Sequence, residues 1–232
     1  SFEIATTINF GCDSDPDTGG DGMAFVIQNQ SADAGINAFG GGTLGYAGIT
    51  PSLAIQMDTY RENPIDFPFV NDPGGGVFNL PYYDHMALML NGQVDHDTPE
   101  DIITVPFTPF YTDVEDCTTG NFHHITISWD ASTNKLDIFY CSQDGNFNTI
   151  SQTIDITNTV FSGNNIAYWG FTGATGGATN EQSVCIDYYS NSPIVQDTIV
   201  CLGIPLDLDF YYLDYFSFEW KDENGIVISN NP

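Results

Sequence analysis

Three side chains next to apolar runs have the chemical types that hold a cation. Asp58 ends the run Leu53–Met57, and Asp72 stands in an Asn-Asp-Pro step. His85 opens the run Met86–Leu90. A hard cation such as Ca²⁺ needs several oxygens from a flexible loop, whereas an imidazole suits a transition metal. If the two runs form neighbouring strands, the three side chains converge. The alternative is that both aspartates cap turns and that His85 is a hydrogen-bonded residue at a strand end.

Two glycine-rich segments are a second candidate for ligand contact. Asp21 stands between glycines just before the apolar run Met23–Ile27, where it is either a turn residue or a carboxylate that binds a ligand. The segment Phe39–Tyr46 lets a ligand approach backbone amides closely, because glycine has no side chain. It has no lysine and follows no βα pattern, which argues against nucleotide binding. The segment Tyr168–Glu181 runs from a strand into another loop of small residues.

Strand patterns dominate the elements that must position these residues. Phe2–Phe10 alternates between apolar and polar side chains apart from Ala5, as a half-buried strand does. The continuous apolar runs are typical of strands buried on both faces. His124–Trp129 and Leu136–Tyr140 are joined by a turn, Asp130–Asn134, which predicts an antiparallel hairpin. No window of a dozen residues has the period of a helix, so the sequence predicts an all-β sandwich.

Individual aromatic and imidazole side chains are assigned by their position on these strands. Trp129 and Trp169 lie on strands and are predicted to be core residues. His123 and His124 stand at a strand start and are predicted to be surface residues rather than ligands. His96, between two aspartates, is predicted to be a solvated loop residue.

The five cysteines form no C-x-x-C pair, so the sequence does not support a zinc or thioredoxin-like motif. Cys117 precedes one strand of the predicted hairpin, and Cys141 ends the other. Antiparallel pairing brings these two ends within disulfide reach. We therefore predict a Cys117–Cys141 disulfide bond and an oxidising compartment. The odd count leaves at least one cysteine whose partner is expected outside this chain.

The charge balance excludes whole classes of partner. The chain has 31 acidic residues against 3 lysines and arginines, a formal net charge of -28. Phosphate backbones and anionic membrane surfaces would be repelled, so we expect neither nucleic acid nor membrane binding. The sequence contains no run of 18 apolar residues, so it predicts no membrane-spanning helix. Most of the acids are assigned to solubility, and only the group around Asp58 to cation binding.

The last 42 residues differ in character from the rest. A boundary is predicted near Ser190–Pro193, which divides the chain into 1–190 and 191–232. The second part is too short to bury a core of its own. We interpret it as a linker and the opening strands of a next, immunoglobulin-like domain. The alternative is a strand extension that docks on the main sandwich.

Five motifs resemble the L-type (legume-like) lectin family, in that family's order. They read D-G-M-A-F-V-I-Q, G-G-G-T-L-G-Y, I-Q-M-D-T-Y…N-D-P…D-H-M-A-L, H-I-T-I-S-W-D and W-G-F-T-G-A-T-G. The resemblance covers residues 1–190 and is strongest to a bacterial branch found in large secreted adhesins of gliding Bacteroidetes. It implies a concanavalin-like jelly-roll β-sandwich, with an N-terminal strand or more before Ser1. It also leaves Cys12 and Cys185 either paired with partners in that strand or paired with each other.

The resemblance implies a sugar site and a calcium site, residue by residue. Asp21 matches the family's sugar-binding aspartate, whose preceding peptide bond, here Gly20–Asp21, is typically cis. The other positions that match sugar contacts are Gly41, Gly42, Asn63, Ala178, Thr179 and Asn180. Those that match metal ligands are Asp58, Tyr60 through its carbonyl, Glu62, Asn63, Asp72 and, for a transition metal, His85.

Two departures from the family pattern bear on these sites. The family's glutamate before the first aspartate is Gln56 here, which removes a charged ligand from the transition-metal position, so we expect calcium and no such metal. The family's asparagine is replaced by Glu62, with Asn63 one place later. Jelly-roll glucanases carry an E-x-D-x-x-E pattern that supplies nucleophile and acid/base. The matching positions are Gln56, Asp58 and Arg61, so we expect no enzyme.

Two functions remain from the sequence. The first is calcium-supported carbohydrate binding by a lectin module of an extracellular bacterial surface adhesin. Its partners would be glycans on cells or polysaccharide surfaces, together with neighbouring domains of the same protein. The second is a structural or protein-binding module of a surface fibre, which keeps the fold and the calcium but not the sugar affinity.

Overall fold

The computed structural model describes ten stretches of the chain: residues 1–11, 20–34, 40–60, 84–95, 108–109, 122–142, 147–177, 179–191, 220–221 and 227–229. The chain divides into two compact units, Ser1–Leu202 and Gly203–Pro232. In the second unit, β11 (Trp220–Lys221) pairs with β12 (Val227–Ser229) in antiparallel fashion. No helix among the described residues is long and apolar enough to cross a membrane.

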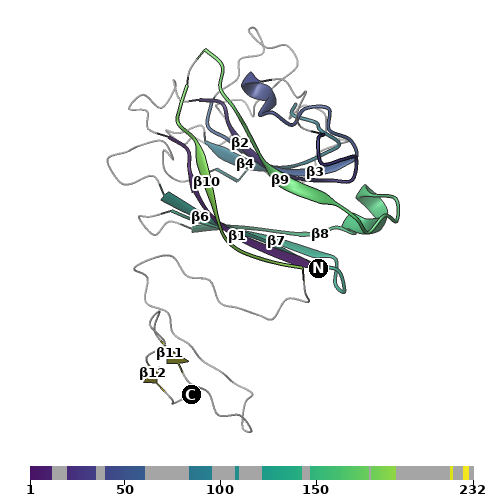
Figure 1. Cartoon of the computed structure of the whole chain (residues 1–232), viewed down its shortest axis with the longest axis vertical. Coiled ribbons are helices and arrows are strands. Elements are labelled where there is room, and N and C mark those ends of the chain that lie inside the picture. Colours follow the sequence, from purple (N-terminus) through teal and green to yellow (C-terminus); the bar gives the residue numbers. More distant parts are fainter. Residues whose placement is uncertain are drawn as a thin grey trace. The chain divides into compact units, whose positions relative to one another are not determined.

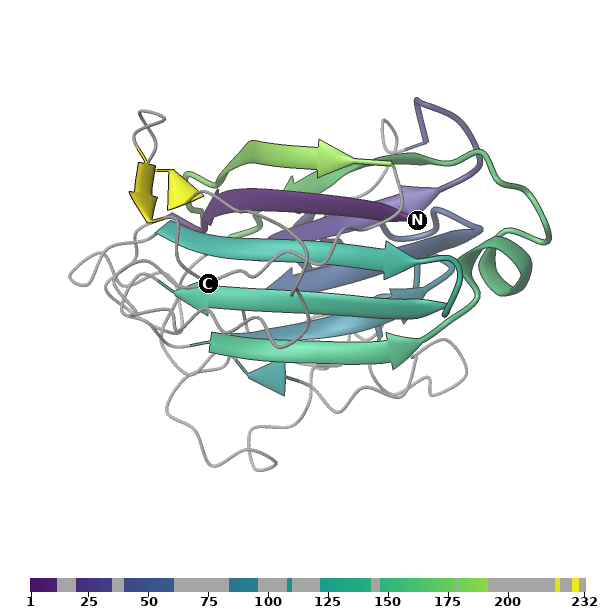
Figure 2. The same ribbon diagram turned by 90° about the horizontal axis from the view of Figure 1, so that it is seen from below.

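The first unit contains two antiparallel five-stranded sheets that face each other (Figure 1). One sheet has the order β10-β1-β6-β7-β8, and its strands lie nearest the viewer in Figure 2. These strands are β1 (Phe2–Asn9), β6 (Phe122–Asp130), β7 (Lys135–Ser142), β8 (Phe147–Thr153) and β10 (Ser183–Ser190). The hairpin predicted from the sequence is confirmed, because β6 and β7 pair in register across a four-residue turn at 131–134.

The second sheet has the order β5-β4-β3-β2-β9. Its strands are β2 (Gly22–Gln28), β3 (Ser52–Asp58), β4 (His85–Leu90), β5 (Thr108–Pro109) and β9 (Tyr168–Ala174). The neighbouring positions of β3 and β4 confirm the expectation that placed Asp58 beside His85, since the two residues are register partners. Apart from strands, the described residues contain only single helical turns, η1 (Gly41–Thr43) and η2 (Ile156–Val160).

The main core lies between the two sheets. Because side chains alternate along a strand, β6 sends Ile125, Ile127 and Trp129 inward, where they meet Phe25 and Ile55 of the facing sheet. Nearly all of these side chains are buried completely. Burial of apolar surface at about 25 cal/mol per Å² is the main force that holds the two sheets together.

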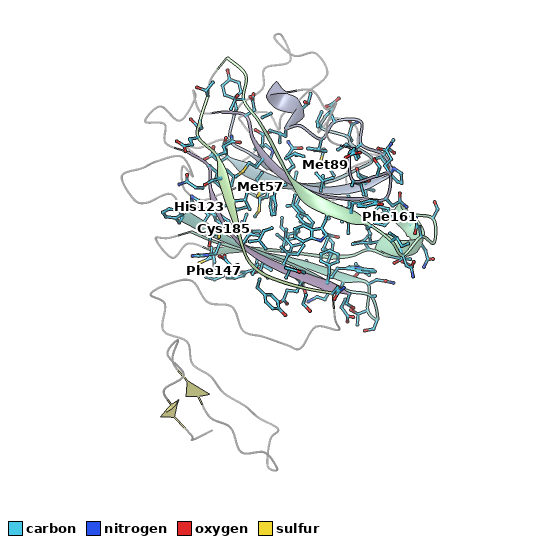
Figure 3. All side chains as sticks on the ribbon, viewed as in Figure 1. Met57, Met89, His123, Phe147, Phe161 and Cys185 are labelled. Carbon is cyan, nitrogen blue, oxygen red and sulfur yellow. The ribbon has the colours of Figure 1, made fainter. Side chains whose placement is uncertain are left out.

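A second, smaller core lies on the other face of the β2–β3–β4 sheet. Leu44, Tyr46 and Ile49 from the glycine-rich segment cover Ala54 of β3 and Met89 of β4. Met57 and Met89, both labelled in Figure 3, therefore belong to different cores on opposite faces of one sheet. Burial on both faces explains why these strands are continuous apolar runs, as the sequence predicted.

Two predictions about single side chains are wrong. Trp169 is 39% exposed, because β9 is the outermost strand of its sheet and leaves one flank uncovered. His123 is only 3% exposed. It shares the inward face of β6 with Ile125, stacks on the Tyr140 ring and lies 2.7 Å from the Tyr140 hydroxyl through Nδ1. Trp129 is a core residue, as predicted.

The cysteine predictions are tested only in part. Cys141 is buried and disulfide-bonded, but Cys117 lies outside the described residues, so their pairing stays a prediction. Cys185 is exposed and free, which rules out the pairing of Cys12 with Cys185. The boundary at residue 190 and the immunoglobulin-like assignment of 191–232 also stay predictions.

Candidate functional site

Asp21 lies immediately before β2 and is 5% exposed. The residue that follows β3 fixes the backbone on both sides of the Asp21 amide. The Thr59 hydroxyl donates to the Gly20 carbonyl at 2.6 Å, and the Thr59 amide donates to the Asp21 carbonyl at 3.3 Å. The Asp21 carboxylate is therefore held at the end of a sheet rather than on a free loop.

The expected cis peptide bond at Gly20–Asp21 is wrong, because this bond is trans in the structure. Among the described residues the one cis bond joins Thr50 and Pro51. The two hydrogen bonds from Thr59 hold the trans backbone in place.

Gly22 determines how closely β2 approaches β3 at this end. Gly22 pairs with Asp58 on one side and with Ala174 on the other. Its φ is +118°, a backbone conformation that L side chains rarely adopt. A Cβ at this position would also collide with the Met57 carbonyl oxygen. Only glycine can therefore follow Asp21, and the aspartate is brought to the same end of the sheet as Asp58.

The loop after β9 approaches Asp21, and the glycine-rich segment lies against that loop. A Cβ added to Gly176, in the loop after β9, would lie 3.2 Å from Asp21 Oδ2. One added to Gly20 would lie 3.0 Å from the Asn180 amide nitrogen, and one added to Gly40 would lie 3.7 Å from the Thr175 carbonyl oxygen. The loop of small residues after β9 thus lies between Asp21 and the glycine-rich segment.

The glycine-rich segment is fixed to the edge of the sheet. Gly41 and Gly42 are buried in η1, and the Thr172 hydroxyl of β9 donates to the Leu44 carbonyl at 2.8 Å. A hollow of about 420 Å³ lies nearby, and Thr172 and Thr175 line it together with the apolar side chains of Met23 and Phe171, but Asp21 does not. Backbone amides and a buried carboxylate are the groups that hydrogen-bond a polyhydroxylated ligand.

Asp58, Tyr60 and His85 are the described members of the expected metal site, and the side chains of Asp58 and His85 are almost completely buried. The Asp58 carboxylate already has two donors. Its Oδ1 accepts from the Tyr60 amide at 3.0 Å, and its Oδ2 accepts from the Gln56 side-chain amide at 2.9 Å. Both oxygens of this buried carboxylate therefore accept a hydrogen bond from a neutral N–H group.

Tyr46 continues this chain of contacts from the second core. Its hydroxyl lies 2.7 Å from Gln56 Oε1 and 2.8 Å from the Gln93 carbonyl oxygen. Burial, and secondarily the negative charge of Asp58, raise the pKa of Tyr46 well above its usual value. The phenol therefore stays protonated and acts as a hydrogen-bond donor.

The donor set fits calcium better than a transition metal. Asp58 and the Tyr60 carbonyl are oxygen ligands, the type that Ca²⁺ prefers. His85 would need a second anionic ligand for a transition metal, and Gln56 presents an amide nitrogen toward Asp58 instead. Within the described stretches no group of three or more His, Cys, Asp and Glu residues is arranged to hold a metal ion. Four predicted site residues lie outside the described residues, namely Glu62, Asn63, Asp72 and Ala178.

The structure adds residues that the sequence did not single out. Thr59 fixes the backbone of Asp21, and Gly176 approaches the Asp21 carboxylate. Gln182 lies against Gly22, with a 3.0 Å contact to the Gly22 carbonyl in its hydrogen-bonding orientation. Asp84, next to His85, is 2% exposed. Asp84 could have been found from its position next to His85 in the sequence. The roles of Thr59, Gly176 and Gln182 depend on loop geometry, which no local sequence pattern shows.

The fold is that of the L-type lectin family. Residues 1–188 match the family described as the legume lectin beta-barrel domain, and the chain belongs to this family. A galactose-binding lectin of Arachis hypogaea is 24% identical over 139 residues, which are 59% of this chain and 41% of that protein. The chain thus matches less than half the length of this relative.

Solved structures with the same fold are also legume lectins. The structure of peanut lectin with a 9mer peptide is similar with a TM-score of 0.55 and 22% identity, over 81% of this chain and 68% of that one. A lectin from Bauhinia forficata in complex with GalNAc has a TM-score of 0.55 and 19% identity, over 81% and 71% of the two chains. At this level of identity the likeness establishes the fold.

Proposed function

We propose that this chain is a non-enzymatic, calcium-supported carbohydrate-binding module of an extracellular bacterial surface adhesin. Family membership supports carbohydrate binding. The finer points rest on the residues themselves. The disulfide bond of Cys141 favours an oxidising compartment, and the net charge of -28 argues against nucleic acid as a partner.

The observation that carries the proposal is the buried Asp21 carboxylate, which the loop after β9 approaches at Gly176 while the glycine-rich segment lies against the same loop. Asp21 would accept hydrogen bonds from two sugar hydroxyls, and such charge-assisted bonds are about twice as strong as neutral ones. Backbone amides of Gly41 or Gly42 would donate to the same sugar. Thr179 and Asn180, in the loop after β9, would contact its other side and tune specificity together with Ala178.

Calcium would act from behind the sugar site. Asp58 and the Tyr60 carbonyl would bind it, together with Glu62 or Asn63 and Asp72 from the segment that follows β3. Gly22 pairs with Asp58, so a cation there orders the strand end that carries Asp21. Removal of calcium would weaken sugar binding through this order and would leave the Asp21 side chain chemically unchanged.

The deciding experiment is a glycan-array screen of the full chain with calcium and with chelator. Asp21→Asn keeps the size of the side chain and removes its charge, and it should abolish binding. Asp33→Asn is the matched control, because Asp33 is an exposed aspartate in a loop before the glycine-rich segment. Equal loss in both variants would contradict the assignment of Asp21.

A second pair of variants tests the geometry of the site. Gly176→Ala places a methyl group 3.2 Å from Asp21 Oδ2, whereas Gly177→Ala meets no atom within 4 Å. We expect the first to weaken sugar binding and the second to leave it unchanged, with equal thermal stability. A folded chain that binds no glycan with or without calcium would favour the alternative, a structural module of a surface fibre.

A further inference from the structure

Three side chains from two segments form one buried hydrogen-bonded chain beneath the candidate site. The Tyr46 hydroxyl lies 2.7 Å from Gln56 Oε1, and Gln56 Nε2 lies 2.9 Å from Asp58 Oδ2. Tyr46 and Gln56 are fully buried, and Asp58 is 1% exposed. Leu44 and Ile49 of the second core cover these three hydrogen-bonded side chains.

Chemistry fixes the direction of each bond in this chain. A carboxylate only accepts, so the amide nitrogen of Gln56 must face Asp58. Its carbonyl oxygen then faces Tyr46, whose phenol must donate. The phenol hydrogen is shared with the Gln93 carbonyl, 2.8 Å away. Each side chain in this hydrogen-bonded series therefore has a donor or acceptor opposite it. The partly positive amide hydrogen of Gln56 faces Asp58 where a cation would otherwise stand.

A glutamate at position 56 would change the charge balance. It would place a second carboxylate beside Asp58 in a water-excluded layer, where like charges repel strongly. Such a pair needs a cation, and His85, the register partner of Asp58, lies on the neighbouring strand to complete its ligand set. The neutral amide of Gln56 removes that need.

We propose that the Tyr46–Gln56–Asp58 chain takes the structural place of a transition-metal ion, so that this site orders Asp58 without one. The inference rests on the proposed role of Asp58 in calcium binding, but it does not depend on sugar binding. Tyr46 is then a positioning residue. It comes from the segment that contains Gly41 and Gly42, so one hydrogen-bonded chain links the sugar-contacting loop to the calcium aspartate.

Binding of Mn²⁺ tests the proposal directly, with bound and free ion distinguished by electron paramagnetic resonance at saturating calcium. We expect no Mn²⁺ bound by the wild-type chain. Gln56→Glu should acquire a single Mn²⁺ site, and addition of His85→Ala should remove it again. Wild-type chain that binds Mn²⁺ and loses it on His85→Ala would overturn the proposal.

The wild-type measurement alone decides the question if Gln56→Glu does not fold. A folded Gln56→Glu chain that binds no Mn²⁺ would also count against the proposal, because the added carboxylate then creates no demand for a cation. Wild-type chain that binds neither Mn²⁺ nor Ca²⁺ would refute calcium in the proposed function, while it would support the absence of a transition-metal site.

Calcium affinity tests the positioning role of Tyr46. Tyr46→Phe keeps the ring in the second core but removes the hydrogen bond from the Tyr46 hydroxyl to Gln56 Oε1. We expect roughly a fivefold loss of calcium affinity, the equivalent of one hydrogen bond. Thr172→Val is the matched control, because it removes another hydrogen bond to the same segment, at Leu44, without contact to Gln56. Equal calcium affinity in wild type and Tyr46→Phe, or equal losses in both variants, would refute this role.

Discussion

Replacement of Gly22 by alanine tests the strand geometry that places Asp21. Gly22 has a φ of +118°, and a side chain there would collide with the Met57 carbonyl oxygen on the neighbouring strand. Gly48 offers a matched control, because its φ is +79° and a Cβ there would meet no atom within 4 Å. The two variants share the chemical change and the positive φ, but only one has the collision.

The magnitudes follow from separate costs. An L-residue in the left-handed region costs roughly 1–2 kcal/mol. Alanine also lowers the conformational entropy of the unfolded chain, which stabilises the folded state by about 0.4–1 kcal/mol. Gly48→Ala should therefore lower the free energy of unfolding by about 1 kcal/mol. Gly22→Ala adds the cost of forcing strands apart, about 1–3 kcal/mol, and should lower it by roughly 2–4 kcal/mol.

Urea denaturation followed by tryptophan fluorescence measures both changes, since Trp129 lies in the main core. Calcium is left out, so that any loss of cation binding does not add to the result. Equal losses in the two variants would refute the argument, because the collision with β3 would then carry no cost. A stable Gly22→Ala chain that keeps sugar binding would refute the placement of Asp21 as well.

Three further outcomes are expected. Trp129→Phe should lower the free energy of unfolding by about 1–3 kcal/mol, because the Ile154 carbonyl loses the 2.9 Å hydrogen bond from the buried indole nitrogen. Far-UV circular dichroism follows this urea transition, since the variant lacks the Trp129 fluorescence. Hydrogen bonds from the turn that follows, first from a backbone amide and then from hydroxyls, lower the pKa of Asp130 from 3.8 to about 2. Because the folded pKa is the lower one, this stabilisation is present above pH 3.8 and is lost as the pH falls toward 2, and Asp130→Asn should remove that part of the pH dependence of unfolding. Maleimide should label Cys185 in the folded chain without reductant but not Cys141, as mass spectrometry of peptides would verify.

Strand positions could be predicted from the sequence because burial leaves a pattern. Strands β2, β3 and β4 are buried at nearly every position and mostly apolar, since one core covers each of their faces. The hairpin of β6 and β7 follows from alternation and a short turn. His123 was open to the same reasoning, because it shares its parity with Ile125 and Ile127 and must therefore face inward.

The edges of the sheets could not be predicted in this way. Alternation tells which face a side chain takes but not whether its strand has a neighbour on both sides. Trp129 and Trp169 both lie on strands with apolar neighbours. Only the order of strands, which is a long-range property, leaves the second of them at an exposed edge.

Some residues of the candidate site could likewise be predicted from local sequence patterns, and others could not. Asp21, Asp58 and His85 could be selected because they stand at the ends of apolar runs, in motifs that resemble the L-type lectin family. Thr59 and Gly176 could not, because their roles come from contacts between segments that are distant in the sequence. Thr59 reaches Gly20 across 39 residues, and no local pattern marks that hydrogen bond.

The second core explains why polar residues at this site must be matched so completely. Leu44, Tyr46 and Ile49 exclude water from the face of β3 that carries Gln56 and Asp58. In such surroundings each hydrogen bond is stronger and each unmatched group more costly than in water. The apolar cover and the polar chain therefore stabilise each other. Because Tyr46 belongs to both, the segment that carries Gly41 and Gly42 cannot move away without exposing the apolar cover and breaking the hydrogen bond to Gln56.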